Sequence, residues 1–62
     1  MAFIDKQAEI GENVYVGEFV VVSTGSKVGK DSKIYPHVYI GENVQIGENV
    51  TIFAGVKLYH DT

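Results

Sequence analysis

The 62-residue sequence contains no cysteine and no tryptophan, and it has a single proline. Without cysteine the chain forms neither disulfide bonds nor a thiolate zinc site, the two devices that commonly stabilise domains of this size. A chain of about 60 residues buries only about 60% of its unfolded surface. The stability must therefore come from an unusually regular core, from oligomerisation, or from neighbouring segments of a longer protein.

Basic residues and long apolar runs are also scarce. Five Lys and Arg residues stand against eight Asp and Glu residues, which gives a net charge of −3. Dispersed basic residues do not form the stripe that binds a nucleic-acid backbone, so nucleic acid is not an expected partner. The longest apolar run, 19–22, is too short for a membrane span or for the core of a signal peptide. The cytoplasm is the expected location.

What the sequence does contain is an aliphatic residue at every sixth position, ten times in succession. A second series of small residues, none larger than valine, precedes the first by two positions. Residues two apart point to the same face of an extended strand, whereas a spacing of six alternates between opposite sides of a helix. Each six-residue unit therefore predicts a short strand with two inward-facing side chains. The first series is Ile4, Ile10, Val16, Val22, Val28, Ile34, Ile40, Ile46, Ile52 and Leu58, and the second is Ala2, Ala8, Val14, Val20, Ser26, Ser32, Val38, Val44, Val50, Val56 and Thr62.

Residues typical of turns follow the aliphatic positions. The Gly-Glu-Asn triplet occurs at 11–13, 41–43 and 47–49, with variants at 17–19 and 29–31. Glycine, asparagine and aspartate accept positive φ angles at low cost. We therefore expect a corner after each strand, with these residues providing the left-handed conformations.

This pattern resembles the hexapeptide-repeat family, whose unit is an aliphatic residue, a small residue, two variable positions, a small residue and another variable position. The resemblance extends from Ala2 to Thr62. It implies an all-β fold, the left-handed parallel β-helix, with three hexads in each triangular coil. The chain then forms about three and a half coils, and we expect residues 1–62 to be a single β-helix fragment.

Three hexads per coil place residues 18 positions apart in one column. The expected inward columns are Ile4, Val22, Ile40 and Leu58; Ile10, Val28 and Ile46; and Val16, Ile34 and Ile52. Two outward columns, Glu9 with Lys27 and Gln45, and Glu12 with Lys30 and Glu48, alternate in charge or polarity. Such columns avoid like-charge repulsion and favour this register.

The outward aromatic residues predict an assembly surface. Tyr15, Phe19, Tyr35 and Phe53 fall near one corner, and Phe3, Val21 and Tyr39 fall on a neighbouring face. Exposed apolar residues at this density are typical of a contact surface. The unpaired edges at the two ends of the coil are a second place where copies can associate. We expect a homo-oligomer, either a trimer or an end-to-end stack.

No catalytic, cofactor-binding or metal-binding residue is identified in the sequence, because no phosphate loop, activated nucleophile, carboxylate pair or ligand cluster is present. The two histidines are the candidates for a general base. His37 lies at a corner beside Pro36 and is interpreted as a surface or interface residue. His60 precedes Asp61, but adjacent residues in a turn rarely form a base and its orienting carboxylate, so a structural role is favoured there too.

Segments 34–41 and 53–61 are similar to the early coils of the UDP-3-O-acylglucosamine N-acyltransferases of lipid A synthesis. These enzymes transfer a 3-hydroxyacyl chain from acyl carrier protein to the amine of a UDP-linked glucosamine, as homotrimers with sites between subunits. The related UDP-N-acetylglucosamine O-acyltransferases begin with similar hexads. The N-terminal nucleotide-contacting domain, the later coils with the catalytic histidine and the C-terminal helices have no counterpart in this sequence. No catalytic residue therefore carries over, and His60 is not the general base of the family.

Three functional hypotheses remain open. The chain is a truncated β-helix segment of a lipid A pathway UDP-3-O-(3-hydroxyacyl)glucosamine N-acyltransferase, inactive alone, and a fragment of a UDP-N-acetylglucosamine O-acyltransferase is the alternative within this hypothesis. It is a self-assembling structural β-helix module, natural or engineered. Or it is a complete small acyltransferase in which His37 or His60 serves as the base, although the sequence provides almost no walls around an acceptor. The sequence favours the first hypothesis.

Overall fold

A computed structural model describes residues 1–59 of the chain. This part contains ten strands of two residues each, one in every hexad, and no helix. The strands are β1 (Phe3–Ile4), β2 (Glu9–Ile10), β3 (Tyr15–Val16), β4 (Val21–Val22), β5 (Lys27–Val28), β6 (Lys33–Ile34), β7 (Tyr39–Ile40), β8 (Gln45–Ile46), β9 (Thr51–Ile52) and β10 (Lys57–Leu58). The six-residue periodicity therefore correctly predicted where each strand lies.

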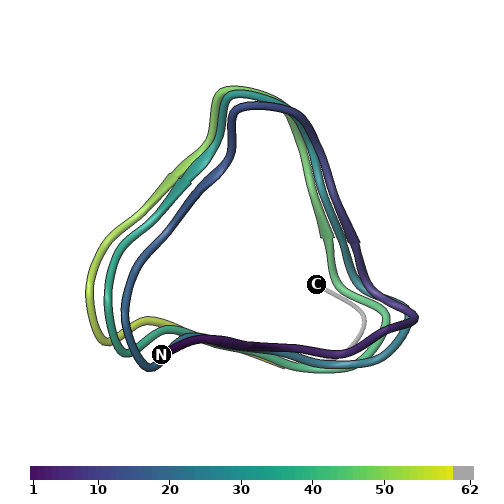
Figure 1. Cartoon of the computed structure of the whole chain (residues 1–62), viewed down its shortest axis with the longest axis horizontal. Coiled ribbons are helices and arrows are strands. Elements are labelled where there is room, and N and C mark those ends of the chain that lie inside the picture. Colours follow the sequence, from purple (N-terminus) through teal and green to yellow (C-terminus); the bar gives the residue numbers. More distant parts are fainter. Residues whose placement is uncertain (60–62) are drawn as a thin grey trace.

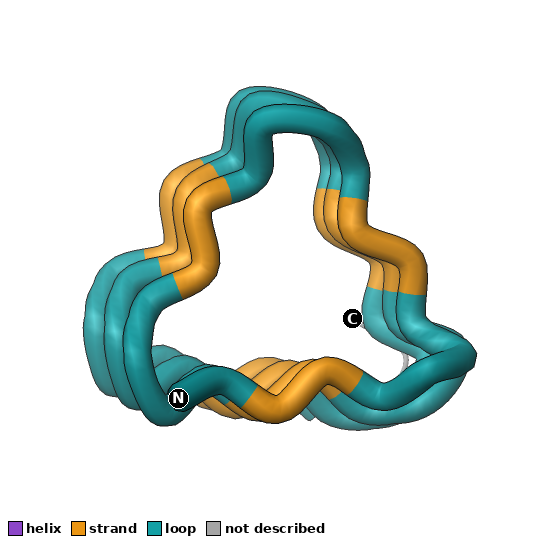
Figure 2. The backbone as a smooth tube through the Cα atoms, in the orientation of Figure 1, coloured by secondary structure: helices purple, strands orange, loops and turns teal. Residues whose placement is uncertain are grey.

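The strands form three parallel sheets on the three faces of a triangular prism (Figures 1 and 2). The strand orders are β1-β4-β7-β10, β2-β5-β8 and β3-β6-β9. In Figure 1 the first coil runs along the lower edge, up the right side and down the left side, and later coils lie farther from the viewer. This anticlockwise descent makes the β-helix left-handed, which confirms the predicted fold class.

The stacking register is 18 residues throughout. Phe3 pairs with Val21, Val21 with Tyr39, and Tyr39 with Lys57 on the first face. The other two faces keep the same offset. The predicted inward and outward columns are therefore confirmed for the described residues.

Backbone hydrogen bonds join consecutive coils and run along the axis of the prism. The N–H of Glu9 donates to the carbonyl of Ser26 at 2.9 Å, and the N–H of Lys27 donates to the carbonyl of Val44 at 2.9 Å. Each coil thus holds the next, and the outermost described strands are β1, β2 and β3 at one end and β8, β9 and β10 at the other.

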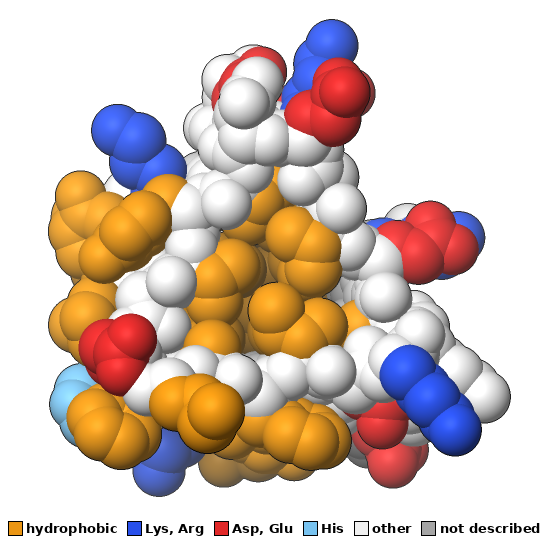
Figure 3. Space-filling view, in the orientation of Figure 1, with side chains coloured by type: hydrophobic (Ala, Val, Ile, Leu, Met, Phe, Trp, Pro, Cys, Tyr) orange, Lys and Arg blue, Asp and Glu red, His pale blue; other side chains and the backbone are white. Residues whose placement is uncertain are grey.

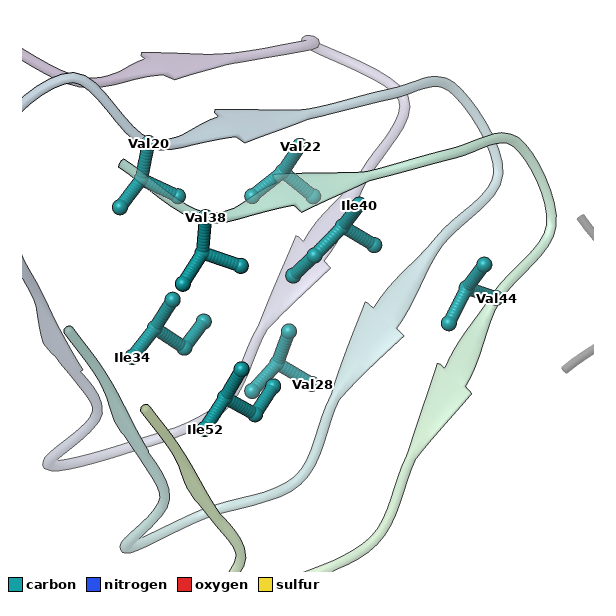
Figure 4. Close-up of a cluster of buried hydrophobic side chains, with 8 residues drawn as sticks. All are labelled: Val20, Val22, Val28, Ile34, Val38, Ile40, Val44 and Ile52. Atoms are coloured by element: carbon teal, nitrogen blue, oxygen red, sulfur yellow. The ribbon is translucent and has the colours of Figure 1, made fainter. Parts of the chain in front are cut away.

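The core fills the inside of the triangle. Eight aliphatic side chains point into it and form one buried cluster: Val20, Val22, Val28, Ile34, Val38, Ile40, Val44 and Ile52 (Figure 4). Burial falls toward the end of the prism, since Ile40 is fully buried whereas Ile4 in the first coil is 39% exposed. The space-filling view shows apolar side chains in the centre of the triangle at the end that faces the viewer (Figure 3).

Two serines in the inner column of small residues are fully buried and fully bonded. The Ser26 hydroxyl donates to the Gly41 carbonyl at 2.5 Å and accepts from the Val44 N–H at 3.1 Å. At the next corner of the prism, the Ser32 hydroxyl donates to the Gly47 carbonyl and accepts from the Val50 N–H. These hydroxyls satisfy backbone groups at the corners, so they add polar atoms to the core at little desolvation cost.

The corners differ from the sequence prediction in the role of glycine. Positive φ angles occur at the third corner position, for example Asn13, Asp31 and Asn49, but not at Gly11 or Gly29. A Cβ atom on Gly29 would lie 2.6 Å from the backbone carbon of Gly47 in the next coil. The corner after each strand is therefore formed as expected, and these two glycines are needed for close approach between coils and not for a left-handed backbone.

Candidate functional site

The predicted assembly surface lies along one edge of the prism, and we call its four residues, Tyr15, Phe19, Tyr35 and Phe53, the aromatic flank. Tyr15 belongs to β3, Tyr35 and Phe53 directly follow β6 and β9, and Phe19 lies at the corner that follows. Their side chains point outward because the inward positions belong to the aliphatic series. In Figure 3 apolar side chains gather on the left edge of the molecule. The structure therefore brings all four predicted residues to one surface.

Three of these rings form a continuous edge-to-face row. The ring centres of Tyr15 and Tyr35 lie 6.4 Å apart at an interplanar angle of 88°, and those of Tyr35 and Phe53 lie 5.9 Å apart at 86°. Phe19 stacks instead on His37, at 5.2 Å and 16°. Edge-to-face and offset-stacked rings attract each other beyond the effect of buried area, so the row is a preorganised surface and not three independent side chains.

The flank is exposed and has a shallow hollow in it. Phe19 is 62% exposed and Phe53 is 66% exposed, whereas Tyr35 in the middle of the row is 37% exposed. The hollow is lined by Tyr15, Lys33, Tyr35 and Pro36. Lys33 was not predicted as a surface feature, although its position one coil after Tyr15 in the same column would have placed it there. The flank thus combines a large apolar area with one positive charge.

His37 belongs to this surface and shows no arrangement of a general base. Its backbone N–H donates to the carbonyl of Glu18 at 3.0 Å, and its ring packs on Phe19. Within residues 1–59, no carboxylate forms a hydrogen bond or ion pair with the imidazole. In the structure His37 is an exposed corner residue. His60 and Asp61 lie outside the described residues.

The other aromatic residues are distributed as predicted on the neighbouring face. Phe3 is 61% exposed on β1, and Tyr39 on β7 packs against Tyr59 with ring centres 6.1 Å apart. This face carries Val21 between Phe3 and Tyr39 in one column. It meets the aromatic flank at the corner formed by Phe19 and His37.

The charged columns stack in the predicted order but do not form close ion pairs. Glu9, Lys27 and Gln45 occupy one register line across β2, β5 and β8. Among residues 1–59, one ion pair has a nitrogen–oxygen distance below 4.0 Å. It joins the N-terminal ammonium group of Met1 to the Glu18 carboxylate. The alternating columns therefore act through avoided repulsion, and they contribute little direct pairing energy.

Residues 1–59 contain no group of three or more His, Cys, Asp or Glu side chains that could hold a metal ion. Every buried side-chain nitrogen and oxygen atom among them has a hydrogen-bond partner. No helix long and apolar enough to cross a membrane occurs among them. The polar side-chain atoms buried in the described part of the chain are thus all engaged in hydrogen bonds.

Comparison with known proteins gives a matching family and a similar solved structure. A family model described as bacterial transferase hexapeptide (six repeats) matches residues 24–60. A crystal structure of the UDP-N-acetylglucosamine acyltransferase of Arabidopsis superposes with a TM-score of 0.87 at 28% sequence identity. The superposition covers 90% of this chain and 19% of that enzyme. Among curated protein sequences, none matches the chain significantly.

Proposed function

The chain belongs to the bacterial transferase hexapeptide family, and we propose that it is a β-helix segment of an acyltransferase that acts on a UDP-linked amino sugar. In this proposal the described residues hold the fold and an assembly surface, and the catalytic groups lie elsewhere in the enzyme. The chain alone is then inactive.

The observation that carries the proposal is the close superposition on one part of a much larger enzyme. A TM-score of 0.87 over 90% of the chain means that nearly every coil finds a counterpart in the UDP-N-acetylglucosamine acyltransferase. The chain spans only 19% of that enzyme's length, so acyl carrier protein and the UDP-sugar are proposed partners of the whole enzyme and not of this segment.

Two acceptors are compatible with the proposal. The matched enzyme favours UDP-N-acetylglucosamine, with transfer to a sugar hydroxyl. The second candidate is transfer to the amine of a UDP-3-O-acylglucosamine, which rests on the similarity of segment 53–61 to the N-acyltransferases. Most of that segment lies in the last coil, and its final two residues lie outside the described part of the chain. We therefore place the O-acyl acceptor first.

Acyl transfer to a hydroxyl or an amine needs a general base within hydrogen-bond reach of the attacking group. Residues 1–59 contain one histidine, His37. Its ring is stacked on the ring of Phe19, and no carboxylate orients it. His37 is exposed at a corner of the prism. These features support a structural role for His37 and a base that lies outside residues 1–59.

The aromatic flank fits a lateral contact with other copies of the same segment. Tyr15, Tyr35 and Phe53 form a row along the prism edge, parallel to its axis. We propose that this edge contributes to a homotrimer in the whole enzyme, as the resemblance to the family implies. A row along the axis suits this contact because every coil of the segment then adds to it.

The test is a chimera in which the three matched coils of the Arabidopsis enzyme are replaced by residues 1–59. We expect the chimera to fold and to retain acyl transfer, because the segment supplies scaffold and assembly surface. A matched chimera with His37→Ala should transfer acyl groups equally well. A folded, trimeric chimera without activity would contradict the proposal, as would acyl transfer by the isolated chain that His37→Ala abolishes.

A further inference from the structure

We propose that the aromatic flank of one copy packs on the β1-β4-β7-β10 face of the next copy, and that three such contacts close a ring around an axis parallel to the prism. The inference rests on the homotrimer proposed above and deepens it, because it identifies the surface that receives the flank. The contact uses the sides of the coils and not their ends. Coils before or after this segment in a longer chain would therefore only lengthen it.

Outward-facing aromatic side chains gather around one corner of the prism. This corner joins the β3-β6-β9 face to the β1-β4-β7-β10 face, since positions 17–20 connect β3 to β4. Figure 3 shows apolar side chains gathered along the left and lower edges of the molecule, which are these two faces. The third face is polar at its outward strand positions, which are Glu9, Lys27 and Gln45. Two apolar surfaces therefore meet at a single corner.

The receiving surface is an uncharged column on the β1-β4-β7-β10 face. Phe3, Val21 and Tyr39 follow one another in register on β1, β4 and β7. Phe3 is 61% exposed and Tyr39 is 38% exposed, and the ring of Tyr59 packs beside that of Tyr39. Apolar side chains on three consecutive strands form a continuous patch, which is typical of a protein contact.

A closed ring of three copies needs two different surfaces on each chain. Every contact in such a ring is heterologous, so the flank of one copy meets another part of its neighbour and not the neighbour's flank. The column of Phe3, Val21 and Tyr39 is the second apolar surface of the described residues. It runs along the prism axis, as the row of Tyr15, Tyr35 and Phe53 does, so the two surfaces match in direction.

The angle between the two surfaces selects three copies. Each face holds one hexad per coil, so the cross-section is close to an equilateral triangle (Figure 2). The direction of a corner then differs by about 60° from the outward direction of the adjoining face, and packing the corner on that face of a neighbour turns the neighbour by about 120°. Three such turns close the ring. Packing the two faces flat against each other would turn each copy by only about 60° and close a ring of six.

The rotation also determines which residues meet. A rotation about an axis parallel to the prism leaves every residue at its own height. The ridge of the corner is formed by the turn positions 18–19, 36–37 and 54–55. Pro36 on this ridge is followed three residues later by Tyr39 on the adjoining face. In the ring, Pro36 of one copy therefore lies against Tyr39 of the next, and the stacked rings of Phe19 and His37 lie beside them.

The first test is sedimentation velocity of the full chain over a wide concentration range, where we expect a species of three copies. Tyr39→Glu places a charge on the receiving column, and the control Gln45→Glu places the same charge on the polar face. Tyr39→Glu should raise the concentration at half-dissociation about tenfold or more, because an unpaired charge is expensive to bury. Gln45→Glu should assemble like the parent chain. Far-ultraviolet circular dichroism checks that each variant is folded.

A disulfide cross-link tests the contact itself, and the chain has no cysteine of its own. A Pro36→Cys chain mixed with a Tyr39→Cys chain should form a disulfide-linked pair of the two under mild oxidation. Lys27→Cys is the matched control, since it places the thiol on the polar face and should not link to the Pro36→Cys chain. This pair of variants carries the test if Tyr39→Glu does not fold.

Several results would overturn the contact. One is a mass that stays at one copy or settles at two or six copies. Another is a Pro36→Cys chain that links mainly to itself, which indicates flank against flank. A folded Tyr39→Glu chain that assembles like Gln45→Glu is a third. These results leave the acyltransferase proposal in place, because acyl transfer by the chimera tests that separately. An inactive chimera would contradict the acyltransferase proposal and not this contact, provided that the mixed disulfide still forms.

Discussion

The rings of Phe19 and His37 stack 5.2 Å apart, and both residues have left-handed backbones, with φ angles of 60° and 65°. Bulky residues rarely adopt this conformation because the Cβ atom crowds the carbonyl group. At the equivalent corner positions on the other faces the chain has Asn13, Asp31 and Asn43, which tolerate it better. At the corner beside the aromatic flank, two bulky residues therefore adopt an unfavourable left-handed backbone conformation, and their rings form a contact at the surface.

The left-handed backbone of His37 leads to a prediction about side-chain shape. We expect His37→Val to be less stable to unfolding than His37→Asn by about 1–2 kcal/mol, because a β-branched side chain fits this conformation worst. Urea unfolding of the two variants measures the difference. At Lys33, which lies in β6, the order should reverse, because valine favours a strand and asparagine does not. Equal stability of the two His37 variants would contradict the prediction.

The glycines of one column should respond in opposite ways to alanine. In Gly29→Ala the new Cβ atom would lie 2.6 Å from backbone atoms of the next coil, so the two coils must move apart. We expect a loss of about 1–3 kcal/mol, as for other overpacked sites. In Gly47→Ala the nearest atom to the new Cβ atom would lie 3.9 Å away. This variant should therefore be as stable as the parent chain or more stable. Thermal unfolding of both variants compares them, and a similar loss at the two positions would show that close approach is not the reason for glycine.

The buried serines should be costly to remove. In Ser26→Ala the Val44 N–H and the Gly41 carbonyl lose a partner inside the prism. A buried polar group left without a hydrogen bond costs about 1–3 kcal/mol, and we expect a loss in this range. Ser23→Ala, at a half-buried position in the same corner, should change stability little. Chemical unfolding with both variants tests this, and an unchanged midpoint for Ser26→Ala would mean that the backbone finds other partners.

Stability should be graded along the axis of the prism. Ile34 is fully buried in the second coil, whereas Ile4 at the end is 39% exposed. Ile34→Ala should cost about 2–5 kcal/mol, which is enough to unfold a domain of this size. Ile4→Ala should cost clearly less, because the Ile4 side chain is already partly exposed. Unfolding measured at low protein concentration separates the two, and an equal loss at both positions would contradict the graded core.

The sequence was sufficient to predict the strands, the columns and the aromatic flank, because all three depend only on the spacing of residue types. Every sixth residue from Ile10 to Leu58 belongs to the core or packs against it as expected, whereas Ile4 in the first coil is 39% exposed. The role of Gly29 was not predictable in this way, since a glycine needed for close approach and a glycine needed for positive φ look the same in a sequence. The sequence also could not predict that Glu12 and Lys30 form no close ion pair, because the register sets the distance between backbones and not between the ends of long side chains.

The hydrogen bonds between coils also determine how the chain can fold. The ladder bonds within each sheet join a residue to one 17 positions further on, as from Glu9 to Ser26, so no turn or hairpin can form them early. The first ladder bond requires the closure of a whole coil, and its entropy cost must be met before any neighbouring contact offsets it. Once two coils are in place, each further hexad adds to an existing edge. We therefore expect slow initiation followed by fast winding, with a rate that depends far more on the first two coils to pair than on the length of the solenoid.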